Sequence, residues 1–148
     1  MIYLDYNATT PVHPAVRQAI YQCLEVDFGN HSSAHAKGQI AASVVAQARK
    51  AVGAAIGAAS GDAIVFTGSA TEANNLALLG VVGAMPATRR HIVISAIEHP
   101  AVLEPALHLQ RLGWQLSIAP VTPDGLLDLP AMQALLNAGN VGLVSVMQ

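Results

Sequence analysis

The stretch TGSATE, residues 67–72, places small hydroxyl side chains and a glycine directly before an apolar helical pattern. The amides of Ala70 and Thr71 would lie in the first helical turn, where the helix offers them no carbonyl partner. Unpaired amides and the helix dipole favour an anion such as phosphate, and Thr71 adds a hydroxyl donor. The same letters also fit a capping box, in which Ser69 and Glu72 satisfy these amides without a ligand. The spacing alone leaves both interpretations open.

A second candidate is His99, which follows an apolar run and stands between Glu98 and Pro100. Pro100 suits the first position of a helix, and it restricts the residue before it to an extended conformation. The imidazole would therefore leave the strand end at a fixed angle. It could stack on a flat ligand or transfer protons near neutral pH. A surface histidine that caps a strand is the alternative interpretation.

The other reactive side chains form no recognisable site. His31 and His35 are four residues apart, but the stretch carries no helix-borne H-E-x-x-H, and the histidines show no ligand spacing with Cys23. We therefore predict no metal site. Cys23 lies within a predicted helix and is expected to be a small buried side chain. No Ser-His-Asp or paired-carboxylate arrangement stands out.

Alternating helices and strands are expected to position these residues. An extended arm over residues 1–13 precedes an α/β domain over residues 14–148. Apolar periodicity predicts helices over residues 14–26, 34–56, 71–84, 100–112 and 129–137, and strands over residues 63–68, 91–97, 114–121 and 141–147. The long helix should bury a spine of apolar residues spaced by four, namely Ile40, Val44, Ala48, Val52 and Ile56. The alternation indicates a largely parallel sheet. Residues 67–72 and 95–100 would then lie side by side at the carboxyl ends of neighbouring strands.

Composition excludes several classes of protein. The 148 residues are 53% hydrophobic and 11% charged, with a net charge of -2 and no basic run, which argues against a nucleic-acid partner. No apolar stretch approaches the ~20 residues of a membrane span. A single cysteine rules out an internal disulfide framework, and no secretory signal opens the chain. We expect a cytoplasmic protein.

Four longer motifs, YLDYNATTPVHP, FGNHSSAHAKG, IVFTGSATEANNLAL and EHPAVLEP, strongly resemble the cysteine desulfurases. These are pyridoxal-phosphate enzymes of the class V aminotransferase group, with the aspartate aminotransferase fold. By position, the resemblance implies that Ala70 and Thr71 bind the phosphate of pyridoxal 5'-phosphate. It implies that the catalytic residue His99 stacks on the pyridine ring and helps to move protons. It also implies a homodimer that removes sulfur from L-cysteine, leaves L-alanine, and passes a persulfide to a sulfur-acceptor scaffold protein for iron–sulfur cluster biosynthesis.

The resemblance covers only the N-terminal part of such an enzyme. The family lysine that binds the cofactor covalently and the persulfide cysteine are expected beyond Gln148. Lys37, Lys50 and Cys23 do not match those positions. We therefore expect an N-terminal fragment that is inactive alone. The alternatives are a non-catalytic half-chain that pairs with another polypeptide, or a relative of the selenocysteine lyases, which share these motifs.

Overall fold

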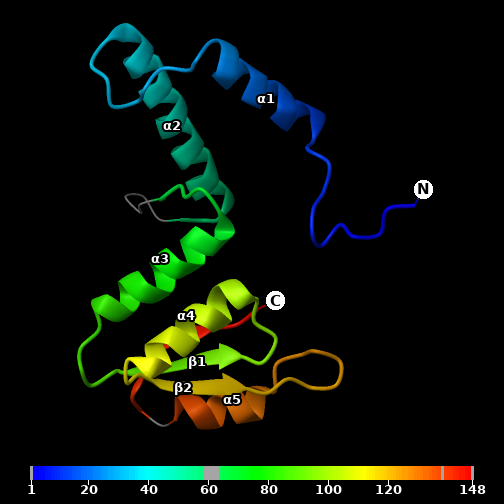
Figure 1. Ribbon diagram of the computed structural model, residues 1–148, viewed down its shortest axis with the longest axis vertical. Helices are drawn as coiled ribbons and strands as arrows, with labels where there is room; N and C mark the ends of the chain where they lie inside the picture. The colour runs from blue at the N-terminus through cyan, green and yellow to red at the C-terminus, as the bar shows by residue number, and fades with distance from the viewer. Residues whose placement is uncertain (1, 59–63, 138, 148) are drawn as a thin grey trace. The chain divides into compact units, whose positions relative to one another are not determined.

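The computed structural model describes residues 2–58, 64–137 and 139–147. It divides into two compact units, residues 1–65 and residues 66–148 (Figure 1).

The first unit contains two helices, α1 (Pro14–Glu25) and α2 (Ala36–Ala55). Residues 2–13 form neither helix nor strand, and a turn in this segment lets the carbonyl of Asp5 accept hydrogen bonds from the amides of Ala8 and Thr9. Each helix begins at a histidine whose ring nitrogen accepts a backbone amide, His13 for α1 and His35 for α2. Both helices lie close to their predicted bounds.

The second unit is an α/β layer structure. Its elements, in chain order, are α3 (Ala70–Gly83), β1 (His91–Ser95), α4 (Pro100–Arg111), β2 (Gln115–Ala119), α5 (Leu129–Leu136) and β3 (Val141–Ser145). The strands form one sheet in the order β2-β1-β3, and β1 pairs in parallel with both neighbours. The predicted α/β fold with a parallel sheet and flanking helices is confirmed.

The central strand β1 is buried on both faces, which explains its continuous apolar run. Ile92 and Ile94 pack with side chains of α3 and α4, whereas Val93 packs with Met132 of α5 on the opposite face. In Figure 1, α4 and α5 accordingly cover different faces of the sheet. Alternate side chains of a strand point to opposite faces, so this five-residue strand supports both helical layers.

A buried polar group joins the three strands where they begin. His91 is 1% exposed, and its Nδ1 and Nε2 lie 3.1 Å from Asn140 Oδ1 and 2.9 Å from Ser117 Oγ. Asn140 in turn donates to the side chain of Gln115 at 3.0 Å. Because both ring nitrogens have partners, the imidazole is accommodated inside the sheet without an unsatisfied polar atom.

The predicted strand over residues 63–68 is wrong for the part that can be described. Residue 63 lies outside the described residues, and residues 64–67 form no strand. A strand needs a neighbour to accept and donate its backbone hydrogen bonds, and the sheet order β2-β1-β3 includes no pairing with this segment. Val65 is 63% exposed. The apolar composition of this segment favours a strand. A strand forms, however, only where a neighbouring strand completes its backbone hydrogen bonds.

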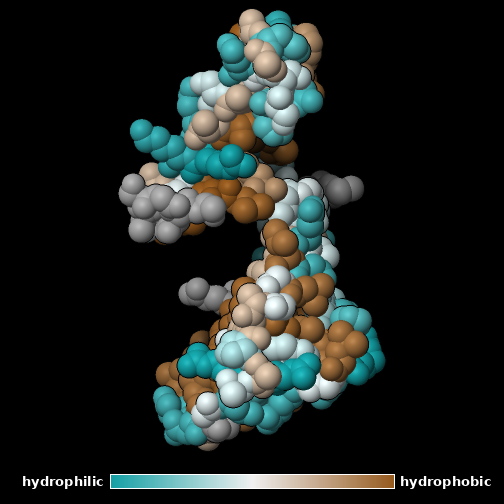
Figure 2. Space-filling model, turned by 90° about the vertical axis from the view of Figure 1, so that its left-hand side faces the viewer, coloured by the Kyte–Doolittle hydropathy of each residue, from teal (hydrophilic) through white to brown (hydrophobic). Residues whose placement is uncertain are grey.

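Two burial predictions in the first unit are also wrong. Cys23 is exposed, and α1 buries no residue. Along α2 the predicted spine is largely open, with Ile40 and Val52 exposed, while Gly38 and Ala41 are buried instead. The amphipathic pattern is present, but no described segment of this unit covers it. Hydrophobic residues therefore reach the surface in both units (brown in Figure 2). No helix of the described chain is long and apolar enough to cross a membrane.

Candidate functional site

The N-terminus of α3 is capped by its own side chains. Ser69 Oγ accepts the amide of Glu72 at 3.1 Å, as the capping-box interpretation predicts. The Glu72 carboxylate reaches one residue further back and accepts the amide of Gly68 at 2.7 Å. The cap therefore satisfies the amides of residues 68 and 72, which flank the helix start.

The cap leaves the amides of Ala70 and Thr71 available. Ala70 and Thr71 are the first residues of α3, both exposed, and within the described residues no acceptor meets their amides or the Thr71 hydroxyl. The capping and anion-binding interpretations of TGSATE therefore do not exclude one another. Two backbone donors, one hydroxyl and the positive end of the helix dipole remain for an anion.

His99 is the N-cap of α4 and has the predicted extended conformation before Pro100, with φ −63° and ψ 148°. Its Nδ1 accepts the amide of Ala101 at 3.0 Å. The loop that carries it is tied down by Ser95, a buried residue whose hydroxyl donates to Glu98 at 2.8 Å. The ring itself is exposed. A rigid backbone thus presents an accessible imidazole.

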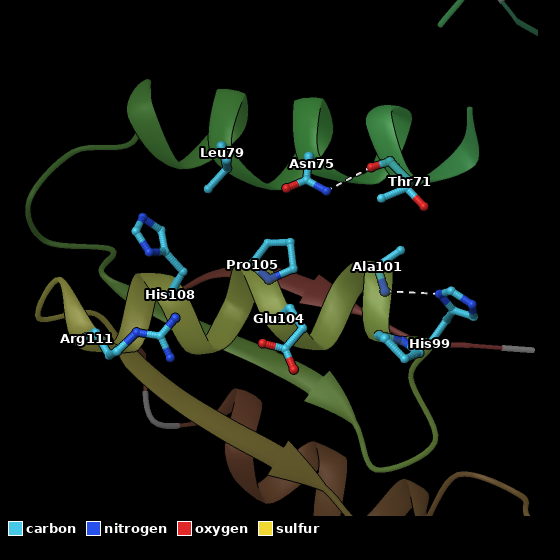
Figure 3. Close-up of a pocket in the computed structure, with 10 residues that line it drawn as sticks. Thr71, Asn75, Leu79, His99, Ala101, Glu104, Pro105, His108 and Arg111 are labelled. Atoms are coloured by element: carbon cyan, nitrogen blue, oxygen red, sulfur yellow. Dashed lines mark hydrogen bonds between the residues drawn. The ribbon is translucent and has the colours of Figure 1, made fainter. Parts of the chain in front are cut away.

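Thr71 and His99 line one open groove of about 490 Å³. In Figure 3, α3 and α4 run side by side in the same direction, so Thr71 and His99 lie at the same end of the groove. One residue of each predicted loop, Thr71 and His99, therefore lies at this groove because α3 and α4 pack together, since the described residues 64–68 form no strand. Ala70 precedes Thr71 on α3 but does not line the groove. The volume lies within the range of small-molecule sites.

Sequence reasoning missed the rest of the groove. Asn75 and Leu79 continue from Thr71 along α3 at a spacing of four, which places all three on one helix face. Asn75 Nδ2 donates to the carbonyl of Thr71 at 2.8 Å, which gives an asparagine inside a helix a local role. The further lining residues belong to α4: Pro100, Ala101, Glu104, Pro105, His108 and Arg111. In Figure 3 the charged Arg111 lies at the end away from Thr71.

The remaining candidate residues take structural positions. His35 caps α2, and His91 is buried in the sheet. No group of three or more histidine, cysteine, aspartate or glutamate side chains that could hold a metal ion occurs among the residues described. Lys37 Nζ donates to the carbonyl of Val26 at 3.0 Å and lies over the Phe28 ring.

Comparison with known proteins gives consistent matches. Residues 2–148 match the family described as Aminotransferase class-V. The cysteine desulfurase IscS of Dictyoglomus turgidum is 40% identical over 146 residues, which is 99% of this chain and 36% of that protein. Among solved structures, a NifS-like protein superposes with a TM-score of 0.88 at 33% identity, over 95% of this chain and 38% of that one. A structure described as SspA in complex with cysteine gives a TM-score of 0.79 at 28% identity, over 97% and 41% of the two chains.

The chain thus spans little more than a third of the length of the curated relatives it matches. The predicted resemblance to cysteine desulfurases, over their N-terminal part, is confirmed, and so is the aspartate aminotransferase-like fold of the large domain. With the whole described sheet and both groove helices inside the match, the chain belongs to the aminotransferase class-V family.

Proposed function

We propose that this chain forms the cofactor-binding front part of a cysteine desulfurase, an enzyme that uses pyridoxal phosphate to convert L-cysteine to L-alanine and passes the sulfur on as a persulfide. The observation that carries the proposal is the groove that Thr71 and His99 both line, at the N-terminal ends of two helices that lie side by side. The similarity to proteins named cysteine desulfurase supports the reaction, and the relative described in complex with cysteine supports the substrate.

The residues at the start of α3 fit the phosphate of the cofactor. The amides of Ala70 and Thr71 and the Thr71 hydroxyl are donors without partners in the described chain, and they suit a phosphate oxygen. Glu72 brings a negative charge to the same turn, but its carboxylate is engaged by the amide of Gly68. His99 would lie against the pyridine ring from the start of α4. When bound, pyridoxal phosphate supplies a carbonyl that reacts with amino groups and a ring that withdraws electrons.

The activity belongs to the longer protein in this proposal, and the chain alone is inactive. The lining of the groove contains no lysine among the described residues, and Lys37 already donates to a backbone carbonyl. A homodimer, a sulfur-acceptor scaffold protein, a part in iron–sulfur cluster biosynthesis and a cytoplasmic location complete the proposal by analogy with the family.

Borohydride trapping tests the cofactor site and the missing lysine together. The chain is mixed with pyridoxal phosphate, reduced, digested and mapped by mass spectrometry, while binding before reduction is followed by absorbance. We expect saturable binding that is weakened in Thr71→Val, without specific modification of Lys37 or Lys50. Stoichiometric labelling of either lysine would contradict the proposed inactivity, and binding indifferent to Thr71→Val would contradict the site.

A second candidate function is a half-chain that pairs with another polypeptide. It is favoured by large apolar side chains at the surface of the second unit, among them Ile118, Val144 and Val146. Purification of the chain from its native source distinguishes the candidates. A co-purifying polypeptide that carries the missing lysine indicates a split enzyme, whereas a stable monomer indifferent to the cofactor leaves neither function standing.

A further inference from the structure

The two ring nitrogens of His99 have different surroundings. Nδ1 lies 3.0 Å from the amide nitrogen of Ala101, which donates to it. A nitrogen that accepts an N–H carries no proton of its own, so the neutral ring must hold its proton on Nε2. No partner for Nε2 occurs within the described residues. The helix cap therefore determines which side of the imidazole carries the proton.

This arrangement is encoded by a local sequence that occurs twice. The letters HPAV stand at residues 13–16 and again at residues 99–102. Proline has no amide hydrogen, so the first donor after the histidine is the alanine at the second helical position. In both copies this alanine amide donates to the histidine Nδ1, at 3.2 Å for His13 and 3.0 Å for His99. The copy at His13 caps a helix outside the groove, so it serves as an internal reference.

The cap restricts what His99 can do to a ligand. The only lone pair with which a neutral imidazole accepts a proton lies on Nδ1, and here it is occupied by the amide of Ala101. Nε2 is therefore the ring nitrogen that carries an N–H, and His99 is one of the residues that line the groove. Glu104, His108 and Arg111 line the same groove from α4, and Glu98 is engaged by Ser95.

We propose that the N-cap of α4 selects, for the neutral His99 ring, the tautomer with its proton on Nε2, so that this nitrogen is the hydrogen-bond donor that the ring offers to a ligand. The role toward a ligand rests on the proposed function, whereas the tautomer follows from the cap alone. The acceptor would be an anionic oxygen, such as a phosphate, carboxylate or phenolate oxygen.

Nuclear magnetic resonance of the full chain, labelled with ¹⁵N, tests the tautomer without any ligand. We expect a scalar coupling across the hydrogen bond between Ala101 N and His99 Nδ1, and in the neutral ring we expect the proton on Nε2 and none on Nδ1. His13 should give the same pattern and His108 should not. Comparison with His99→Asn, which keeps a capping acceptor but removes the ring, assigns the signals. A protonated Nδ1, or no coupling to Ala101, would overturn the proposal.

A second measurement adds saturating pyridoxal phosphate to the same sample. The proposal expects the coupling to Ala101 to persist and the Nε2 proton to shift as it meets an acceptor. Movement of the proton from Nε2 to Nδ1, with loss of the coupling to Ala101, would overturn the donor role of Nε2. If the cofactor leaves every signal of Thr71 and His99 unchanged while the coupling is intact, the proposed cofactor site fails and the tautomer stands.

Discussion

Substitutions at neighbouring residues of the α3 N-terminus should separate helix capping from anion binding. Ser69 Oγ accepts the amide of Glu72, whereas the hydroxyl of Thr71 has no partner among the described residues. We predict that Ser69→Ala lowers the stability of the chain and leaves its affinity for pyridoxal phosphate nearly unchanged. Thr71→Val should leave the stability nearly unchanged and lower the affinity for pyridoxal phosphate, because valine keeps the shape of the side chain and removes only the hydroxyl.

The magnitudes follow from the bonds involved. Loss of a serine N-cap costs about 1 kcal/mol of unfolding free energy. At Thr71 the exposed substitution should change stability by less than about 0.5 kcal/mol. A hydrogen bond to a charged group contributes roughly 1.5–3 kcal/mol, so removal of the Thr71 hydroxyl should weaken binding about tenfold to a hundredfold.

The assay combines urea unfolding, followed by circular dichroism, with titration of pyridoxal phosphate by absorbance in the absence of denaturant. Ser69→Asn is the matched control, because asparagine caps as well as serine and should restore stability. The reasoning is refuted if Ser69→Ala abolishes binding in a chain that remains folded while Thr71→Val binds normally. That result would assign the anion to the cap instead of to the free donors.

Other predictions concern the sheet that supports the groove. A Cβ at Gly142 would overlap the carbonyl oxygen of Arg89, so Gly142→Ala should destabilise by about 1–3 kcal/mol in urea unfolding. Gly80→Ala on α3 meets nothing and should instead stabilise by about 0.5–1 kcal/mol; equal effects of the two would contradict the packing. Replacement of the buried His91 by phenylalanine leaves its two hydrogen-bond partners unsatisfied and should lower the free energy of unfolding by about 2 kcal/mol in the same assay. The exposed His108→Phe should change it by less than about 0.5 kcal/mol. A neutral effect at His91 would show that the polar group adds no stability.

Local sequence determined much of this fold because the signals are themselves local. Pro100 fixed the start of α4 and the extended backbone of His99, and the apolar run of β1 indicated a strand buried on both faces. The exposure of Cys23 and of most of the α2 spine could not be predicted in the same way. Amphipathicity states which face of a helix is available for packing, but burial requires a second surface that covers it.

The candidate site was predictable where a residue ends or begins an element. Thr71 and His99 both lie at helix starts, where capping residues and proline give a clear signal in the sequence. Asn75, Glu104 and Arg111 lie on helix faces, and their membership in one groove depends on how α3 and α4 pack. The four-residue spacing from Thr71 to Asn75 indicates that both residues lie on one face of α3. It does not indicate which other helix packs against that face.

The most direct test of the central claim is the pattern of backbone amide shifts when pyridoxal phosphate is titrated into the full chain. The account predicts the largest changes at Ala70, Thr71 and His99. It predicts little change at Ala131, whose amide is already satisfied by the Asp128 cap of α5. Shifts that spread equally over the N-termini of α3 and α5, or that leave Thr71 and His99 unmoved, would contradict it.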